Sequence, residues 1–249
     1  MIFYFTATGN SKFIAEKIAA ETGEQIIDIA ECIKNNEFDF DLSGNEKLGI
    51  VLPIYYYGPP LIVVEFLEKL NITAKDDYYR YAILNCGGQT GETKKIITKY
   101  FQFDAVFGLK TVDNYVPLFK SESDEKVEVL LDQAELAITE IITQINNQSC
   151  GDFNSAKGIL PSLITTVAYP LYKHGRKTRK FKVNDQCVSC NLCADICPRK
   201  TIELKDGRPV WQTPQCELCL ACLHRCPVAA ISYGNSIKNG RYLNPRVEL

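Results

Sequence analysis

The strongest constraint on this chain is a repeat of cysteines in its last third. Of the 11 cysteines in 249 residues, eight lie between Cys187 and Cys226. They form two copies of the pattern C-x2-C-x2-C-x3-C-P, and the second copy begins 29 residues after the first. Where thiols are kept reduced, such clustering indicates metal or redox chemistry rather than disulfides. The two copies are Cys187, Cys190, Cys193, Cys197 and Pro198, and Cys216, Cys219, Cys222, Cys226 and Pro227.

This spacing resembles that of the bacterial two-cluster ferredoxins over about residues 181–234. The resemblance implies two 4Fe-4S clusters with crossed ligands. The spacing is compatible with crossing, because three close cysteines on a tight loop reach only three corners of a cube. The fourth cysteine of each copy would then complete the other cluster. The expected sets are Cys187, Cys190, Cys193 and Cys226 for cluster one, and Cys216, Cys219, Cys222 and Cys197 for cluster two.

Two structural zinc sites stay open as the alternative to the clusters, because thiolates also bind zinc. His224 lies inside the second copy of the pattern. We expect it to be exposed to solvent rather than to bind a metal, since the cysteines already satisfy both clusters. Between the two copies, residues 203–211 predict a hairpin that turns at Asp206 and Gly207.

The first 150 residues alternate strand and helix patterns, which is typical of a doubly wound α/β sheet. The strand segments mostly lack polar alternation, so we expect a parallel sheet covered on both faces. A long amphipathic helix over about 127–145 closes this part. Strands are expected at 2–5, 25–29, 47–54, 79–85 and 105–112, and shorter helices at about 11–22, 59–70 and 92–101.

A loop rich in hydroxyl groups follows the first expected strand and leads directly into a helix. Backbone N–H groups at the start of a helix bind anions, and Gly9 allows a tight turn. The chain has no G-x-x-x-x-G-K-S/T or G-x-G-x-x-G pattern, which disfavours nucleoside triphosphate hydrolysis and the usual dinucleotide site. The loop suits a terminal monophosphate. Its residues are Thr6, Ala7, Thr8, Gly9, Asn10 and Ser11.

This loop resembles the phosphate loop of flavodoxins, and the expected strands fit their sheet over residues 1–148. The resemblance implies a five-stranded parallel sheet of order 2-1-3-4-5, with FMN at the carboxyl ends of the central strands. The loops expected to contact the flavin consist of Pro53, Ile54, Tyr55, Tyr56 and Tyr57, and of Asn85, Cys86, Gly87, Gly88 and Gln89. They lack the tryptophan and the Asp-x-Tyr sequence that are common in flavodoxins. A domain that keeps the loop and binds no flavin stays open as the alternative.

Other residues near these loops have less specific interpretations. Asp113, Asn114 and Tyr115 follow the fifth expected strand, and they either approach the flavin ring or shape a turn. The three cysteines outside the repeat are interpreted as small buried hydrophobic residues. They are Cys32, Cys86 and Cys150.

The charge divides the chain in the same way as the motifs. Residues 1–150 hold 13 Lys/Arg and 23 Asp/Glu, whereas residues 151–249 hold 15 and 7. We expect a flavodoxin-like domain over 1–149, a linker over 150–180, and an α+β two-cluster ferredoxin domain over 181–249. The linker is expected to open as a loop at 151–155 and to contain a short helix near 159–172. The six basic residues from Lys173 to Lys182 either dock an acidic redox partner or form a solvated linker.

The whole chain resembles the fusions of a flavodoxin-like domain with a bacterial-type ferredoxin domain that are found in anaerobes. That resemblance implies an electron-transfer protein, which passes electrons between FMN and two 4Fe-4S clusters to or from a redox partner. An FMN-dependent reductase of a small molecule, fed by the clusters, is the alternative, so it stays open whether the chain is an enzyme. No catalytic acid–base pair or nucleophile stands out.

No segment predicts export or a membrane span. The start of the chain has no basic leader, and the apolar stretch at 159–172 is too short for a bilayer and contains Pro161 and Pro170. No recognition fold for nucleic acid surrounds the basic run. We therefore expect a cytoplasmic protein with neither a membrane span nor a nucleic-acid partner.

Overall fold

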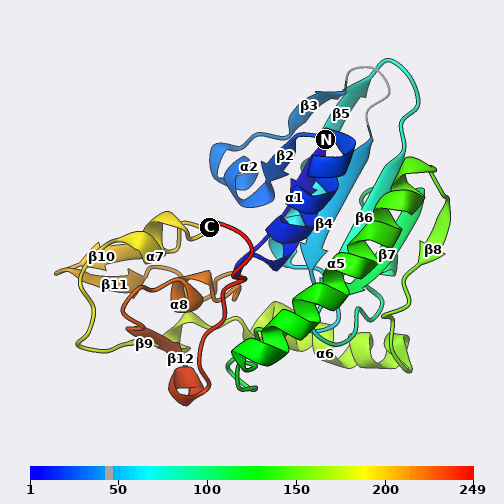
Figure 1. Ribbon diagram of the computed structural model, residues 1–249. Coiled ribbons are helices and arrows are strands. Elements are labelled where there is room, and N and C mark those ends of the chain that lie inside the picture. Colours follow the sequence, from blue (N-terminus) through cyan, green and yellow to red (C-terminus); the bar gives the residue numbers. More distant parts are fainter. Residues whose placement is uncertain (43–46) are drawn as a thin grey trace.

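A parallel sheet forms the centre of the amino-terminal part of the molecule (Figure 1). The structure is a computed structural model that describes residues 1–42 and 47–249. In these residues the sheet has six strands, and five of them have the expected order 2-1-3-4-5. From edge to edge, they are β2 (Ile26–Asp28), β1 (Ile2–Tyr4), β4 (Leu48–Pro53), β6 (Arg80–Cys86), β7 (Ala105–Lys110) and β8 (Gly151–Phe153).

The sixth strand, β8, corrects the sequence-based expectation. The pattern at 151–155 predicts a loop, which is wrong for the first three of these residues. They pair in parallel with β7, in the register Ala105 to Gly151. An edge strand presents a row of unpaired N–H and C=O groups, and β8 pairs with that row on β7. The rings of Phe107 and Phe153 also stack, with centroids 5.2 Å apart.

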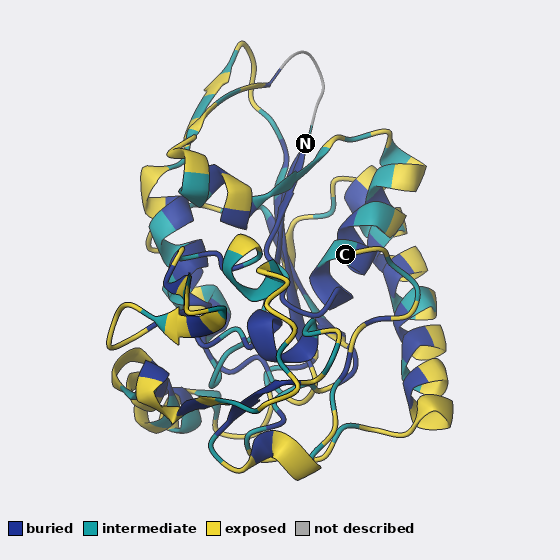
Figure 2. Ribbon diagram, turned by 90° about the vertical axis from the view of Figure 1, so that its left-hand side faces the viewer, coloured by how far each residue is buried: buried dark blue, intermediate teal, exposed yellow. Residues whose placement is uncertain are grey.

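Neighbouring residues in the strands point into two different cores, because side chains alternate across a sheet. Ile50 of β4 belongs to one core and Val51 to the other. Figure 2 shows the buried strands between two layers of helices. Burial on both faces explains why the strand sequences lack polar alternation. The helices in the first core are α2 (Ile29–Asn35), α3 (Leu61–Lys69) and α4 (Thr93–Ile97), and those in the second are α1 (Asn10–Thr22) and α5 (Asp124–Asn146).

A second, separate pair of parallel strands consists of β3 (Asp39–Leu42) and β5 (Asn71–Ala74). The sequence pattern indicates neither strand, because both are short and partly exposed. The pair is connected to the first core by aromatic packing. The ring of Phe40 contacts that of Phe3, with centroids 4.8 Å apart.

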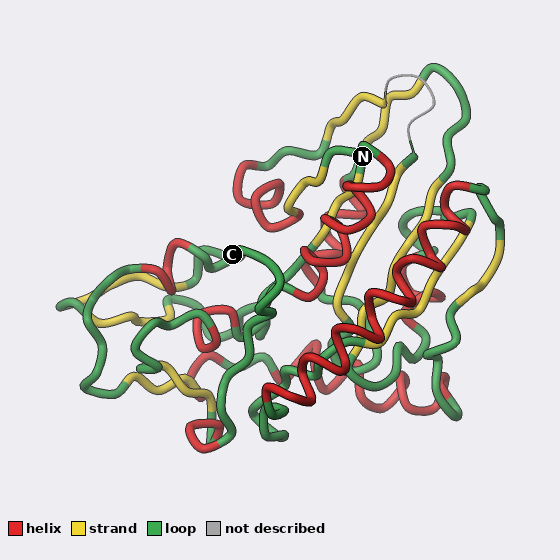
Figure 3. The backbone as a smooth tube through the Cα atoms, viewed as in Figure 1, coloured by secondary structure: helices red, strands yellow, loops and turns green. Residues whose placement is uncertain are grey.

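The cysteine-rich part contains mostly loops and short elements, as Figure 3 shows. Its strands form two antiparallel pairs. The hairpin turns at Asp206 and Gly207 as expected, and their φ angles of 50° and 74° are those of a tight hairpin turn. The pairs are β9 (Phe181–Val183) with β12 (Ile231–Tyr233), and β10 (Ile202–Lys205) with β11 (Arg208–Trp211). The short helices are α7 (Leu192–Asp195), α8 (Ala221–His224), η1 (Thr178–Lys180) and η2 (Ser236–Lys238).

Helix α6 (Pro161–Gly175) lies between the two parts and confirms the helix expected near 159–172. Its Tyr169 hydroxyl donates to the carbonyl of Pro59 at 2.8 Å, and its Tyr172 hydroxyl donates to Glu217 at 2.5 Å. Helix α6 therefore contacts both the sheet domain and the cysteine-rich part. Within the residues that the structure describes, no helix is long and apolar enough to cross a membrane.

Candidate functional site

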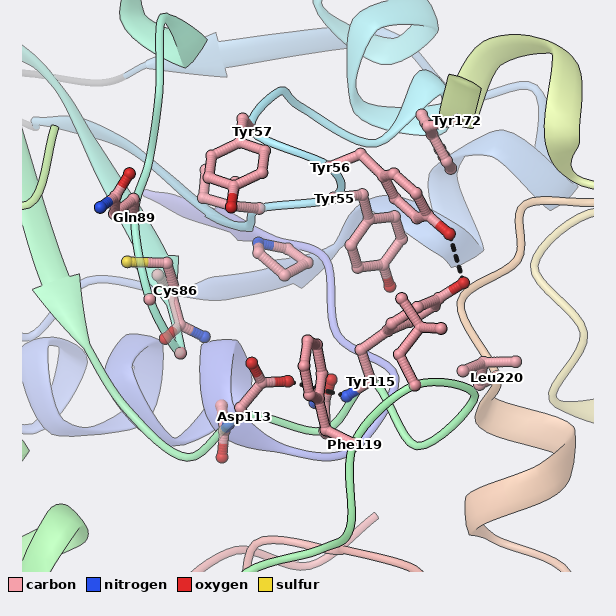
Figure 4. A pocket seen from close by; sticks show the side chains of 18 of the residues that line it. Tyr55, Tyr56, Tyr57, Cys86, Gln89, Asp113, Tyr115, Phe119, Tyr172 and Leu220 are labelled. Carbon is pink, nitrogen blue, oxygen red and sulfur yellow. Dashed lines mark hydrogen bonds between the residues drawn. The ribbon is translucent and has the colours of Figure 1, made fainter. Parts of the chain in front are cut away.

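A cavity of about 410 Å³ lies at the carboxyl ends of β4, β6 and β7, and we call it the main cavity (Figure 4). Its size is within the range of small-molecule and cofactor sites. Residues 53–57, 85–89 and 111–115, at the ends of these three strands and in the loops after them, form one side. Helix α6 and residues 218–220 of the second cysteine loop form the other. The cavity is thus enclosed jointly by the sheet domain and the cysteine-rich part.

Tyrosines form one wall of the main cavity. The loop after β4 turns sharply, because Tyr56 and Tyr57 both have positive φ angles, 50° and 63°. The ring of Tyr56 stacks on that of Tyr172 with centroids 6.0 Å apart, and its hydroxyl hydrogen-bonds that of Tyr115. Burial raises the pKa of Tyr115, so this phenol stays neutral. The wall offers flat, uncharged surfaces to a ligand ring.

The opposite edge of the main cavity consists of the end of β6 and the loop after it. Asn85, near the end of β6, is buried, and its Nδ2 donates to Ser11 Oγ at 3.3 Å. The backbone of Gly87 lies close to Asp113, and a Cβ atom added to Gly87 would lie 2.5 Å from the Asp113 Cβ. Cys86 is buried, and burial raises the pKa of its thiol to about 12, so it is neutral at neutral pH. This agrees with the interpretation of Cys86 as a small apolar residue.

The loop at residues 6–11 has the backbone geometry of an anion site. Gly9 precedes α1 with a φ of 104°, and its N–H donates to Thr6 Oγ1 at 3.0 Å. Among the described residues, the backbone N–H groups of Thr8, Asn10 and Ser11 have no protein acceptor. The first N–H groups of a helix generally have none within the helix, and they bind anions well. The loop therefore fits a phosphate monoester.

The structure does not bring every residue of this loop into the main cavity. Asn10 lines it, whereas Thr6 lines a neighbouring cavity of about 230 Å³. Thr8 and Ser11 are buried, and their hydroxyls accept hydrogen bonds from asparagine side chains. Ala7 and Gly9 line neither cavity. The hydroxyls of Thr8 and Ser11 each still have their own O–H to donate, so the loop offers a phosphate both hydroxyl and backbone N–H donors.

The eight repeat cysteines surround two small hollows, and each hollow brings together one of the crossed sets. The first hollow is lined by Cys187, Cys190, Cys193 and Cys226. The second is lined by Cys216, Cys219, Cys222 and Cys197. None of the 11 cysteines, all of which lie in the described residues, forms a disulfide. Within the described residues, no three His, Cys, Asp or Glu side chains converge as the ligands of one metal ion do.

The two cysteine loops repeat the same backbone conformation. Ser189 and Leu218 have φ angles of 57° and 54°, and Asn191 and Leu220 both have 63°. Positive φ angles are uncommon outside glycine, so their recurrence at equivalent positions shows that the sequence repeat is also a structural one. In the second loop, the N–H of Leu218 donates to Cys216 Sγ at 3.3 Å. Hydrogen bonds to sulfur are one means by which proteins set the potential of a cluster.

The two hollows differ in their surroundings. In the first set Cys190 is exposed, whereas in the second set Cys216 and Cys222 are buried. Cys219 lines the second hollow and also the main cavity. The second hollow therefore adjoins the main cavity, whereas the first has an exposed cysteine, Cys190, in its wall.

Family models match both parts of the chain. The model described as a flavodoxin domain matches residues 1–105, and the 4Fe-4S dicluster domain model matches residues 179–235. The pyruvate synthase subunit PorD of Methanocaldococcus jannaschii is 31% identical over 80 residues, which cover 28% of this chain and 93% of that protein. The chain belongs to the two-cluster ferredoxins and carries a flavodoxin domain.

Two further relatives each match one part. Flavodoxin 1 of Salmonella typhimurium is 26% identical over 168 residues, which cover 58% of this chain and 93% of that protein. An uncharacterized ferredoxin of Methanocaldococcus jannaschii is 38% identical over 53 residues, or 20% of this chain, and the chain spans only 35% of its length. A flavodoxin domain implies FMN, and a dicluster domain implies iron–sulfur clusters. The predictions of these cofactors and of electron transfer are confirmed.

A buried carboxylate connects the ferredoxin domain to the flavodoxin domain. Glu217 is 1% exposed, and its Oε1 accepts hydrogen bonds from the Ile62 N–H at 3.2 Å and the Tyr172 hydroxyl at 2.5 Å. Its Oε2 accepts from Arg199 Nε at 2.9 Å, and Arg199 also pairs with Glu65 of α3. The network joins both cysteine motifs to α3 and α6.

The sequence patterns did not predict this network, although a comparison of the two copies of the repeat singles out its two charged residues. Aligning the two copies places Glu217 opposite Val188, and Arg199 opposite Val228. Both partners of the ion pair thus stand where the other copy has valine. These two differences between the copies fall on residues of the ferredoxin domain that contact the flavodoxin domain.

Two side chains lie in surroundings that differ from the expectation. His224 is not exposed but buried, because its Nε2 donates to the Asn114 carbonyl at 3.0 Å and its Nδ1 accepts from the Tyr242 N–H at 3.1 Å. Burial lowers the pKa of His224 to about 4, so the ring is neutral. Cys150 is exposed rather than buried, because it lies in the turn before β8. Cys32 and Cys86 are buried as expected.

Proposed function

We propose that the main cavity holds the flavin ring of FMN and that the loop at residues 6–11 holds its phosphate. We propose further that the two crossed cysteine sets are the ligands of the two 4Fe-4S clusters. FMN exchanges one or two electrons and each cluster exchanges one, so together they link two-electron to one-electron chemistry. The observation that carries the proposal is the position of Cys219, which lines both the main cavity and the second hollow.

We propose the domain division already given, with residues 1–149, 150–180 and 181–249 as flavodoxin domain, linker and ferredoxin domain. The residues that line the two cysteine hollows all lie between Phe181 and Ile231, which supports the last boundary. The linker is not a passive connection in this proposal. Its strand β8 extends the sheet, and its helix α6 forms part of the main cavity.

The cofactor proposal is tested by composition. Protein purified without oxygen is expected to contain about eight iron atoms, about eight acid-labile sulfides and about one FMN per chain. The assay combines iron and sulfide determination with flavin fluorescence after release of the cofactor. A colourless protein that contains zinc and no acid-labile sulfide would establish the zinc alternative instead.

We propose that the basic residues from Lys173 to Lys182 dock an acidic redox partner. Lys173, Lys177 and Lys180 are exposed, and among the described residues none of these three forms an ion pair. The run lies beside the second cysteine set, since Arg176 Nη1 donates to the carbonyl of Cys216. An unpaired basic surface next to a cluster suits electrostatic docking, which acts mainly on the rate of association.

Lys177→Glu is expected to lower the second-order rate of electron exchange with an acidic ferredoxin several-fold at low salt, because charge reversal weakens long-range attraction. The difference from the unmodified protein is expected to disappear at high ionic strength. Lys205→Glu, an exposed charge reversal on the hairpin, is the matched control. Stopped-flow kinetics measures both rates. Equal rates for the two variants at low salt would exclude docking at this run.

A further inference from the structure

Residues 242–249 leave the ferredoxin domain after η2 and return to the flavodoxin domain, as the red end of the chain in Figure 1 shows. We call residues 242–249 the return segment. It contacts the loop at residues 6–11 through its backbone, since the Asn244 N–H donates to the Thr8 carbonyl at 2.8 Å. It also contacts α1, because Lys12 Nζ donates to the Glu248 carbonyl at 2.6 Å. These contacts join the return segment to residues 8–12 at the expected phosphate site.

The return segment also fixes the side chain of Asn10. Asn10 Oδ1 accepts hydrogen bonds from the Tyr242 hydroxyl at 2.6 Å and from Asn244 Nδ2 at 3.1 Å. On the other side, Asn10 Nδ2 donates to Thr111 Oγ1 at 3.2 Å and to the Val112 carbonyl at 3.0 Å. An asparagine amide offers two donated and two accepted hydrogen bonds, so the capacity of this buried side chain is filled. Its orientation is therefore set by both domains.

Gly9 shows how closely the return segment covers the loop. A Cβ atom on Gly9 would lie 2.8 Å from Val247 Cγ1 and 2.9 Å from Asn244 Cβ. The segment bonds to a carbonyl and to a side-chain oxygen of the loop. The backbone N–H groups that an anion requires remain available, as described above for Thr8, Asn10 and Ser11. The contact thus supports the loop without using its anion-binding donors.

The return segment is fixed at both ends of this contact. Arg246 Nη2 bonds to Glu128 at 2.5 Å and to Asp132 at 2.7 Å, both on α5 of the flavodoxin domain. At the other end, the Tyr242 N–H donates to His224 Nδ1 on α8, two residues from Cys222. The segment therefore connects the second cysteine loop to the phosphate loop.

We propose that the return segment is part of the FMN site, and that Tyr242 and Asn244 are positioning residues that hold the phosphate loop in its anion-binding shape. The ligand recognised through them is the phosphate monoester of a flavin. This inference rests on the proposed binding of FMN by the loop. It adds that FMN retention depends on residues contributed by the ferredoxin domain.

Tyr242→Phe tests this role, because it removes one hydroxyl and keeps the ring. Cluster-containing protein is depleted of flavin and titrated without oxygen with FMN and, separately, with riboflavin, which lacks the phosphate. Tyr242→Phe is expected to raise the Kd for FMN roughly fivefold, as for one lost hydrogen bond, and to leave the Kd for riboflavin unchanged. Tyr79→Phe is the matched control, since its hydroxyl donates to the Ser149 carbonyl at 2.6 Å, outside the loop.

The outcomes separate this inference from the proposed function. If the unmodified protein binds no FMN, the proposed flavin site itself is wrong. If the unmodified protein binds FMN and Tyr242→Phe binds it equally well, the return segment has no positioning role. Equal weakening for FMN and riboflavin would also overturn the inference, because it would locate the effect at the ring. Arg246→Ala, which releases the segment from α5, is expected to raise the Kd for FMN in the same selective way. Iron content verifies that each variant is folded.

Discussion

Cys219→Ala is expected to remove one cluster and to weaken FMN binding, whereas Cys190→Ala is expected to remove one cluster and leave flavin content intact. The difference follows from position, since Cys219 lines both the second hollow and the main cavity, whereas Cys190 lines only the first hollow. Both variants should fall from about eight to about four iron atoms per chain. Only Cys219→Ala should raise the Kd for FMN, on the order of tenfold, because it disrupts a cavity wall.

Cys86→Ala is the control for this comparison. Cys86 lines the main cavity but lies outside the repeat, so the variant should keep both clusters. Iron, sulfide and flavin are measured on the same anaerobic preparations. If Cys86→Ala loses iron, or if Cys190→Ala and Cys219→Ala lose FMN equally, then the second hollow is not coupled to the flavin site through Cys219.

The second large effect is expected from the ion pair between Arg199 and Glu217. Arg199→Val leaves a carboxylate that is 1% exposed without its cationic partner. Breaking a fully buried pair costs about 3–5 kcal/mol, and because the Arg199 side chain is 23% exposed, we expect a loss near the lower end of this range. For a chain of this size, the melting temperature should fall on the order of 10 °C. Valine is the natural replacement, because Val228 occupies the equivalent position in the other copy.

The double variant Arg199→Val/Glu217→Val decides whether the effect comes from the pair. Without either charge, the double variant should melt higher than Arg199→Val alone, since replacing both charges avoids the unpaired carboxylate. Differential scanning calorimetry of cluster-containing protein gives the melting temperatures. If the melting temperature of the double variant falls by the sum of the losses in Arg199→Val and Glu217→Val, the two residues act independently. The network is then not what connects the domains.

The parts of the fold that depend on local patterns were predictable from the sequence. The existence of the five strands follows from buried segments alternating with amphipathic helices, and their order follows from the resemblance of the chain to flavodoxins. The hairpin follows from Asp206 and Gly207 at its turn. The loops that line the main cavity were also found, because in a parallel sheet the carboxyl ends of the strands meet at one edge. The cysteine sets that line each hollow were predicted from the resemblance of the repeat to two-cluster ferredoxins, with which its spacing is compatible.

The parts that depend on contacts between distant segments were not predictable. Strand β8 has only three residues and forms because β7 has a free edge. His224 is buried because the loop carrying Asn114 and the return segment pack on it, and nothing near it in the sequence indicates this. Glu217 looks like a surface residue until α3 and α6 supply its partners. In each case the deciding partner lies far away along the chain.

We propose that electrons pass within one molecule between the clusters and FMN through the second cysteine set. Flash photoreduction measures this transfer, with an external photoreductant that delivers one electron to the first cluster while flavin absorbance is followed. Transfer within one molecule should bleach the flavin with a rate constant that does not depend on protein concentration, and this bleaching should be lost in Cys219→Ala reloaded with FMN. If the rate of bleaching rises in proportion to protein concentration, electrons move between molecules and the proposed path is wrong.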